Sequence, residues 1–244
     1  MSLAIVYTRA ALGIEAPLIT VEVHLSNGLP GLTMVGLPET TVKEARDRVR
    51  SALINSGYAF PAKKITINLA PADLPKEGGR YDLPIALALL VASEQLNTTR
   101  LNQYEFVGEL ALTGGLRGVP GAIPSAMEAI KAGRRIVVSS DNAAEVGLIG
   151  GSDCLVADHL QEVCAFLAGQ TSLSPPLAEA PARDERYEDL LDVIGQQQGK
   201  RALEIVAAGG HNLLLIGPPG TGKTMLASRL PGLLPPLSNQ EALE

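Results

Sequence analysis

A glycine-rich run of eight residues near the end of the chain lies between an apolar stretch and a helix-forming stretch. The run is Gly217, Pro218, Pro219, Gly220, Thr221, Gly222, Lys223 and Thr224. Its spacing is that of a phosphate-binding P-loop. Residues 212–216 before it predict a short buried strand, and residues 225–230 after it predict a helix. A strand, a glycine loop and a helix in this order indicate an α/β fold for this part of the chain.

The loop residues predict how a nucleotide would be bound. Backbone N–H groups must converge on phosphate oxygens at a helix N-terminus, and a Cβ would obstruct that approach, which Gly220 and Gly222 avoid. The two prolines have no N–H to donate, so we expect them to stiffen the loop entry. Lys223 is expected to reach the β- and γ-phosphates, and the Thr224 hydroxyl is expected to ligate magnesium. The predicted cofactors are ATP and Mg²⁺.

The motif alone does not predict ATP hydrolysis. Hydrolysis also needs an acidic pair on a later strand to hold magnesium and activate water, and usually an arginine from a neighbouring subunit. The chain ends 20 residues after Thr224, at Glu244. We therefore expect this polypeptide to bind nucleotide weakly and not to turn it over. Ser238 and Glu241 have the spacing of a capping box, so we expect the native protein to continue.

Composition excludes several classes of protein. The chain has 244 residues, a hydrophobic content of 46%, a net charge of −6 and only 3% aromatic residues. These values predict an acidic globular protein without a global field for nucleic acid or an aromatic stacking platform. Cys154 and Cys164 have neither disulfide-framework nor zinc-site spacing. Residues 1–10 have no basic region before an apolar run, and the longest apolar stretch, residues 83–92, is too short to span a bilayer, so we expect a cytoplasmic location.

Hydrophobic periodicity predicts a mixed α/β arrangement for residues 1–169. Residues 4–32 read as strands with a hairpin at Asn27 and Gly28, and residues 64–69 read as another strand. Residues 40–55 have the period of an amphipathic helix. Residues 83–93 are apolar on every side, which is typical of an interior helix, and Asp82 is its expected N-cap.

The rest of the chain continues this pattern and then changes character. Residues 107–112 and 116–119 predict a second hairpin, 125–132 and 159–167 predict helices, and 135–139 and 154–157 predict strands. Residues 170–186 are rich in Ser, Pro, Ala and charge, which is typical of a linker. Residues 195–208 again have a helical pattern. The predicted domains are therefore 1–169 and 187–244, joined by 170–186.

Several segments resemble one known family. They are residues 36–39 (GLPE), 68–78 (NLAPADLPKEG), 108–114 (GELALTG), and 210–212 (GHN) leading into the P-loop. By these segments the chain is identified as a member of the ComM/YifB family of magnesium-chelatase-like AAA+ proteins, with a resemblance that covers the whole chain. The resemblance implies a first domain with the α+β fold shared by the Lon protease domain and ribosomal protein S5 domain 2. It also implies a following AAA+ ATPase domain.

The resemblance carries functional expectations as well. Family members are similar to hexameric DNA motors, and ComM is linked to branch migration during natural transformation, so the implied partners are DNA and further copies of the chain in a ring. Val193 and Ile194 match the family's adenine-side segment and would contact the base; the alternative is that they are ordinary core residues.

The first domain is not expected to be a peptidase. Residues 75–80 resemble the Lon segment that holds the nucleophilic serine, but Arg80 stands at the serine position. Residues 121–126 occupy the region where Lon supplies its activating lysine, and they contain no lysine. The serine–lysine chemistry of that class therefore has neither of its members here. Arg80 beside Asp82 could form a ligand site, but we favour an ion pair between them that orders the loop.

Other interpretations remain open. Lys43, Arg46 and Arg50 could contact DNA phosphates or a neighbouring subunit, but a solvated mixed-charge helix face is favoured because Glu44 and Asp47 lie among them. A chelatase-like subunit that uses ATP for metal insertion into a porphyrin is an alternative function. A nucleotide-independent partner-binding module is another.

Overall fold

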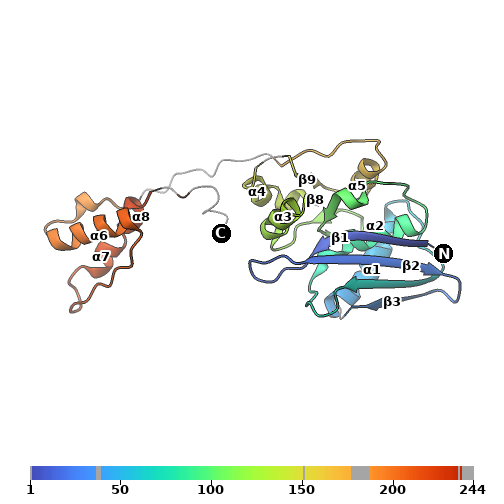
Figure 1. The fold of residues 1–244 in the computed structure, drawn as a ribbon, viewed down its shortest axis with the longest axis horizontal. Helices are drawn as coiled ribbons and strands as arrows, with labels where there is room; N and C mark the ends of the chain where they lie inside the picture. Colours follow the sequence, from blue (N-terminus) through green and yellow to red (C-terminus); the bar gives the residue numbers. More distant parts are fainter. Residues whose placement is uncertain (1, 37–39, 151, 177–186, 236, 238–244) are drawn as a thin grey trace. The chain divides into compact units, whose positions relative to one another are not determined.

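The computed structural model describes residues 2–36, 40–150, 152–176, 187–235 and 237, without the side chains of 40–43. The chain divides into two compact units, residues 1–179 and residues 180–242. Figure 1 shows the first unit as a sheet with helices and the second as a small group of helices. The fold class is α/β, as predicted.

A seven-stranded mixed sheet forms the frame of the first unit. Its order is β3-β4-β2-β1-β5-β8-β9. The strands are β1 (Ser2–Arg9), β2 (Leu18–Ser26), β3 (Gly31–Val35), β4 (Lys64–Ala70), β5 (Tyr104–Phe106), β8 (Arg135–Ser139) and β9 (Cys154–Ala157). The pairs β1–β2 and β2–β4 are antiparallel, and the other neighbours are parallel. A separate two-stranded hairpin joins β6 (Glu109–Leu110) to β7 (Leu116–Arg117), as predicted.

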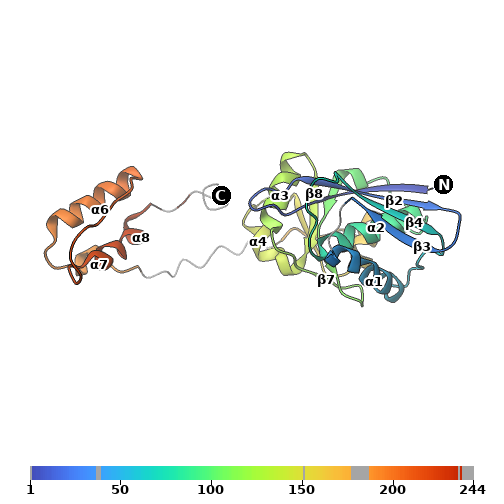
Figure 2. The ribbon, with the colours of Figure 1, turned by 90° about the horizontal axis from the view of Figure 1, so that it is seen from below.

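Helices cover the two halves of the sheet differently. Along β2, alternate residues such as Val21 and Val23 are buried, and this inner face packs against α2 (Asp82–Ala92), which in turn contacts α1 (Thr40–Asn55). Figure 2 shows both helices on one side of β2, β3 and β4. Helices α3 (Ala122–Lys131), α4 (Ala143–Gly147) and α5 (Leu160–Leu167) pack against β8 and β9. Because Ile136 and Val137 lie in different apolar clusters, β8 is buried on both faces.

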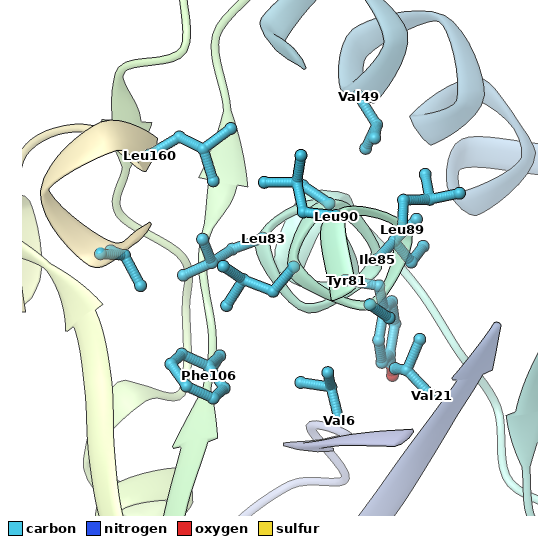
Figure 3. Close-up of a cluster of buried hydrophobic side chains, with 14 of the residues drawn as sticks. Val6, Val21, Val49, Tyr81, Leu83, Ile85, Leu89, Leu90, Phe106 and Leu160 are labelled. Atoms are coloured by element: carbon cyan, nitrogen blue, oxygen red, sulfur yellow. The ribbon is translucent and has the colours of Figure 1, made fainter. Parts of the chain in front are cut away.

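Helix α2 is the centre of the larger core. Ten of its eleven residues are buried, so the prediction of an interior helix is confirmed. Figure 3 views α2 nearly end-on, with Leu83, Leu89 and Leu90 pointing to different sides. Strands, α1 and α5 supply the surrounding apolar side chains. A helix with no polar face can be stable only in such surroundings, because each side must find apolar partners.

Two predictions of local secondary structure in the first unit, a hairpin and a helix cap, are wrong. Asn27 and Gly28 do not close a hairpin, because β4 lies between β2 and β3 and pairs with both. Alternation predicts which face of a strand is buried but not which strand is its neighbour. Asp82 is not an N-cap either: it is the first residue of α2, and its carboxylate accepts hydrogen bonds from the Arg48 side chain and the Leu110 N–H.

The second unit contains η4 (Leu190–Asp192), α6 (Gln197–Gly209), α7 (Lys223–Ala227) and α8 (Leu230–Leu233). Val193, Leu203 and Leu226 form its buried cluster. The predicted strand at 212–216 is wrong, since these residues have no regular structure and Ile216 is 86% exposed. A strand needs a hydrogen-bonded neighbour, and no strand occurs among the described residues of this unit.

Candidate nucleotide-binding site

The glycine-rich loop of the second unit is a compact turn that leads directly into α7. Gly220 and Gly222 have φ angles of +80° and +81°, a region where residues with a Cβ are strained. Gly222 caps α7, which begins at Lys223. The Thr221 hydroxyl donates to the carbonyl of Pro218 at 2.9 Å and closes the loop on itself. The two glycines therefore give the loop the reversal of direction that a phosphate cradle requires.

Lys223 places its ammonium group over this loop. Its Nζ donates to the carbonyls of Gly217 at 2.9 Å and Pro218 at 2.7 Å. Among the described residues no carboxylate pairs with it. The Thr221 hydroxyl also accepts from Nζ at 3.4 Å. The positive charge is thus held at the loop by neutral oxygen atoms, which a phosphate oxygen can replace. Thr224 follows in the first turn of α7 and is exposed.

Side chains of distant segments hold α7 in place. Leu226 is 4% exposed and packs in the cluster of Val193 and Leu203. A Cβ at Gly199 would lie 2.8 Å from Leu226, so α6 and α7 approach closely at that point. Tight packing behind the loop fixes the direction in which α7 points its N-terminus.

An ion pair ties the start of the second unit to α7. Arg229 donates to Glu188 at 2.8 Å and to the carbonyl of Met225 at 2.7 Å, and the Ser228 hydroxyl donates to the same carboxylate. The sequence analysis did not identify this pair, because nothing in the local pattern links residues 41 positions apart. Only knowledge of the fold could have found it.

The segment expected on the adenine side is split between core and surface. Val193 is 1% exposed inside the apolar cluster, whereas Ile194 is 95% exposed. Gln196 donates to the carbonyl of Thr221 at 3.3 Å, so this segment lies beside the loop. Sequence reasoning missed Gln196, whose only local signal is the preceding Gly195. Contact with adenine stays a prediction for both Val193 and Ile194, and Ile194 is the one with its side chain available.

The peptidase-like segment of the first unit is built around buried cations. Arg80 is 4% exposed and donates to the carbonyls of Arg9 and Pro120. Burial lowers the pKa of Arg80 and also that of Lys76, whose ammonium donates to the carbonyls of Pro71 and Leu74. These cations order the chain around them.

The expected pairing of Arg80 with Asp82 is wrong. Asp82 pairs with Arg48, whose Nε lies 2.7 Å from the carboxylate, and Arg80 uses main-chain carbonyls instead. Ser125 is the hydroxyl of residues 121–126, and it donates to the carbonyl of Gly121 at 2.8 Å. In the described part of the chain, no cluster of three His, Cys, Asp or Glu residues could hold a metal ion. No described helix is both long and apolar enough to cross a membrane.

The fold and the loop define the class of this protein. It is a P-loop protein in which a larger α/β unit precedes the loop-bearing unit. Residues 21–142 match the family described as subunit ChlI of Mg-chelatase, and residues 189–244, which include the P-loop, match the family described as magnesium chelatase, subunit ChlI.

Relatives narrow the class to one family. The chain is 78% identical to the YifB protein of Salmonella typhimurium and 75% identical to that of Escherichia coli, over 244 residues in each case. It is 58% identical to the competence protein ComM of Haemophilus influenzae. Each alignment covers 100% of this chain and 48 to 49% of the relative, so the chain spans about half the length of the curated relatives it matches. The chain belongs to the ComM/YifB family of magnesium-chelatase-like proteins.

Proposed function

We propose that this chain is the ATP-binding N-terminal part of a ComM-type AAA+ ATPase. The complete protein would be a cytoplasmic ring, of hexameric type, that moves branched DNA during natural transformation and recombination. The observation that carries the nucleotide site is the Lys223 ammonium, held by the carbonyls of Gly217 and Pro218 in a loop whose Gly220 and Gly222 are left-handed. The similarity to a relative named competence protein ComM supports the rest.

The residues present suit a nucleotide triphosphate with magnesium. The N–H groups of residues 220–224 would donate to phosphate oxygens, and Lys223 would exchange its two carbonyl acceptors for β- and γ-phosphate oxygens. The Thr224 hydroxyl would ligate Mg²⁺, which neutralises charge on the phosphates when bound. Ile194 would cover one face of the base. For this chain by itself we propose nucleotide binding without turnover.

A chelatase-like ATPase is the second candidate function. It is favoured by the names of the two families matched, which both refer to magnesium chelatase. Stimulation of ATP hydrolysis in the complete protein separates the two functions. Branched DNA should stimulate it in the first case, and a porphyrin-binding partner in the second. Binding of a partner by the first unit with no nucleotide present would favour the third possibility, a nucleotide-independent module.

Nucleotide binding can be tested on this chain by titration with a fluorescent ATP analogue and Mg²⁺. Replacing Lys223 with alanine should weaken binding by roughly tenfold to a hundredfold, because hydrogen bonds to charged groups contribute about 1.5–3 kcal/mol. Lys200→Ala, on α6 in the same unit, is the matched control and should bind as the unmodified chain does. Equal affinity of the Lys223 and Lys200 variants would refute the site. Chelation of Mg²⁺ should weaken binding in the unmodified chain.

A further inference from the structure

A hollow of about 200 Å³ opens in the first unit beside the β3 edge of the sheet. It lies between α1, the chain entering β3 and the segment that leads into β4. Its deeper part is apolar and its outer part is basic. The deeper residues include Leu32, Phe60 and Ile65, and the outer ones are Arg46, Arg50 and Lys63. We call this feature the basic hollow.

Arg50 is preorganised at the basic hollow. Its guanidinium carbon lies 5.1 Å from the centroid of the Phe60 ring. A guanidinium group stacked on a ring keeps the N–H donors at its edge free, and this planar fork matches two oxygens of a phosphate. Within the described residues Arg50 forms no ion pair, so no carboxylate competes for that edge.

Lys63 and Arg46, the other two cations of the basic hollow, also lack a strong ion pair among the described residues. Lys63 likewise has no carboxylate partner among the described residues, and its carbonyl accepts from the Gly31 N–H at 3.3 Å, which anchors its backbone to the start of β3. Arg46 lies one helical turn before Arg50 on α1. Its pairing with Asp47 at 3.7 Å involves side chains that are 57% and 86% exposed, and such a contact contributes little. The hollow therefore carries a local positive charge in a chain whose net charge is −6.

We propose that the basic hollow binds the phosphate backbone of a single-stranded nucleic acid. A stacked fork with two further cations suits successive phosphodiester groups. A flexible single strand can bend a phosphate into a recess of this size, whereas a duplex presents a stiff convex backbone. Because the net charge of the chain opposes a long polyanion, contact should be confined to a few nucleotides. This inference rests on the proposed function, because it gives the DNA of a ComM-type motor a binding site on the first unit. The site needs no nucleotide at the P-loop, so its failure can be told apart from failure of ATP binding.

The test is fluorescence anisotropy of a labelled oligothymidylate titrated with the 244-residue chain. With two to three phosphates neutralised, the logarithm of the affinity should fall with the logarithm of salt concentration at a slope of about −1.4 to −2.1, because each phosphate of a single strand contributes about −0.7. Arg50→Glu/Lys63→Glu should weaken binding at least tenfold, by roughly the loss of two phosphate contacts. Lys131→Glu/Arg201→Glu is the matched control: it makes the same charge change at side chains 67% and 73% exposed, and its affinity should change less than about twofold.

Two further variants sharpen the result. Arg50→Lys keeps the charge but loses the fork, so it should bind several-fold more weakly. Lys223→Ala should leave oligonucleotide affinity unchanged, which separates failure of this site from failure of the ATP site. The circular dichroism spectrum of each variant must match that of the unmodified chain.

Absence of binding by the unmodified chain would overturn the proposal. Equal losses in the two charge-reversal variants would do the same, because they would show a response to net charge alone. Stronger competition by an oligoglutamate peptide than by unlabelled oligothymidylate would assign the basic hollow to an acidic protein partner and would also overturn it.

Discussion

Asp82 should make the first unit less stable as pH rises toward neutrality. Its side chain is 0% exposed, and it accepts hydrogen bonds from the Arg48 Nε at 2.7 Å and from the Leu110 N–H at 3.2 Å. Burial raises the pKa of Asp82 from 3.8 to about 6, and this effect exceeds the lowering by Arg48. The loss of hydration therefore affects the pKa of Asp82 more than the ion pair with Arg48 does.

The sign follows from proton binding. Between pH 3.8 and about pH 6 the folded chain holds a proton on Asp82 that the unfolded chain has released. The folded state thus binds more protons, so stability falls as pH rises through this window. A shift of roughly two pKa units corresponds to about 3 kcal/mol at most. That loss is complete above about pH 6.

The assay is urea unfolding between pH 4 and pH 7, followed by far-ultraviolet circular dichroism of the strands, all of which lie in the first unit among the described residues. Asp82→Asn removes the titrating group and leaves the effects of other carboxylates in place. The difference in unfolding free energy, unmodified minus Asp82→Asn, should fall by up to about 3 kcal/mol as pH rises. A difference that rises with pH would refute the reasoning, because it would mean that Arg48 holds the pKa of Asp82 below its usual value.

Two further changes probe the core of the first unit by urea unfolding. Leu89→Ala in α2 should lower the free energy of unfolding by about 2–5 kcal/mol, because Leu89 is fully buried. Leu3→Ala in β1 is the control and should lower it by less than about 0.5 kcal/mol, because Leu3 is 62% exposed. Similar losses in the two variants would contradict the central place of α2 in the core. Glu105→Gln should lower the free energy of unfolding by about 3–5 kcal/mol. The buried Glu105 carboxylate lies 2.6 Å from Arg9 and 2.9 Å from Arg134, and its loss of charge leaves the buried Arg9 without an anion. An unchanged free energy of unfolding would show that water reaches the pair.

The sequence predicted the elements of the first unit well because its periodicities are strong. Alternation in β2 predicts that one face of the strand is buried, and the fully apolar sequence of α2 predicts that all sides of the helix are buried. The structure confirms both predictions. What periodicity cannot show is the order of strands. The insertion of β4 between β2 and β3 depends on contacts far apart in sequence, so the turn at Asn27 and Gly28 misled the prediction.

Polar partners were the hardest part to predict. An Asp before an apolar helix is a good N-cap candidate by local chemistry, but Arg48 on α1 reaches Asp82 once the two helices pack together. Arg80 was then left to main-chain carbonyls. Each buried polar group pairs with whichever partner lies next to it in the folded protein, and that neighbour depends on the tertiary fold. The P-loop differs because its glycine conformations are local, so its turn could be predicted from eight residues.

The loop keeps its shape although the strand predicted before it is absent. Residues 212–216 pair with no strand among the described residues of the second unit, and Leu214 is 80% exposed. The loop is held from its other end, by Leu226 in the apolar cluster and by the pairing of Arg229 with Glu188. Strand pairing would also hold the loop at Gly217, so less conformational entropy would be lost when a nucleotide binds and orders the loop. Affinity for ATP should therefore rise in any context that supplies a neighbouring strand to residues 212–216.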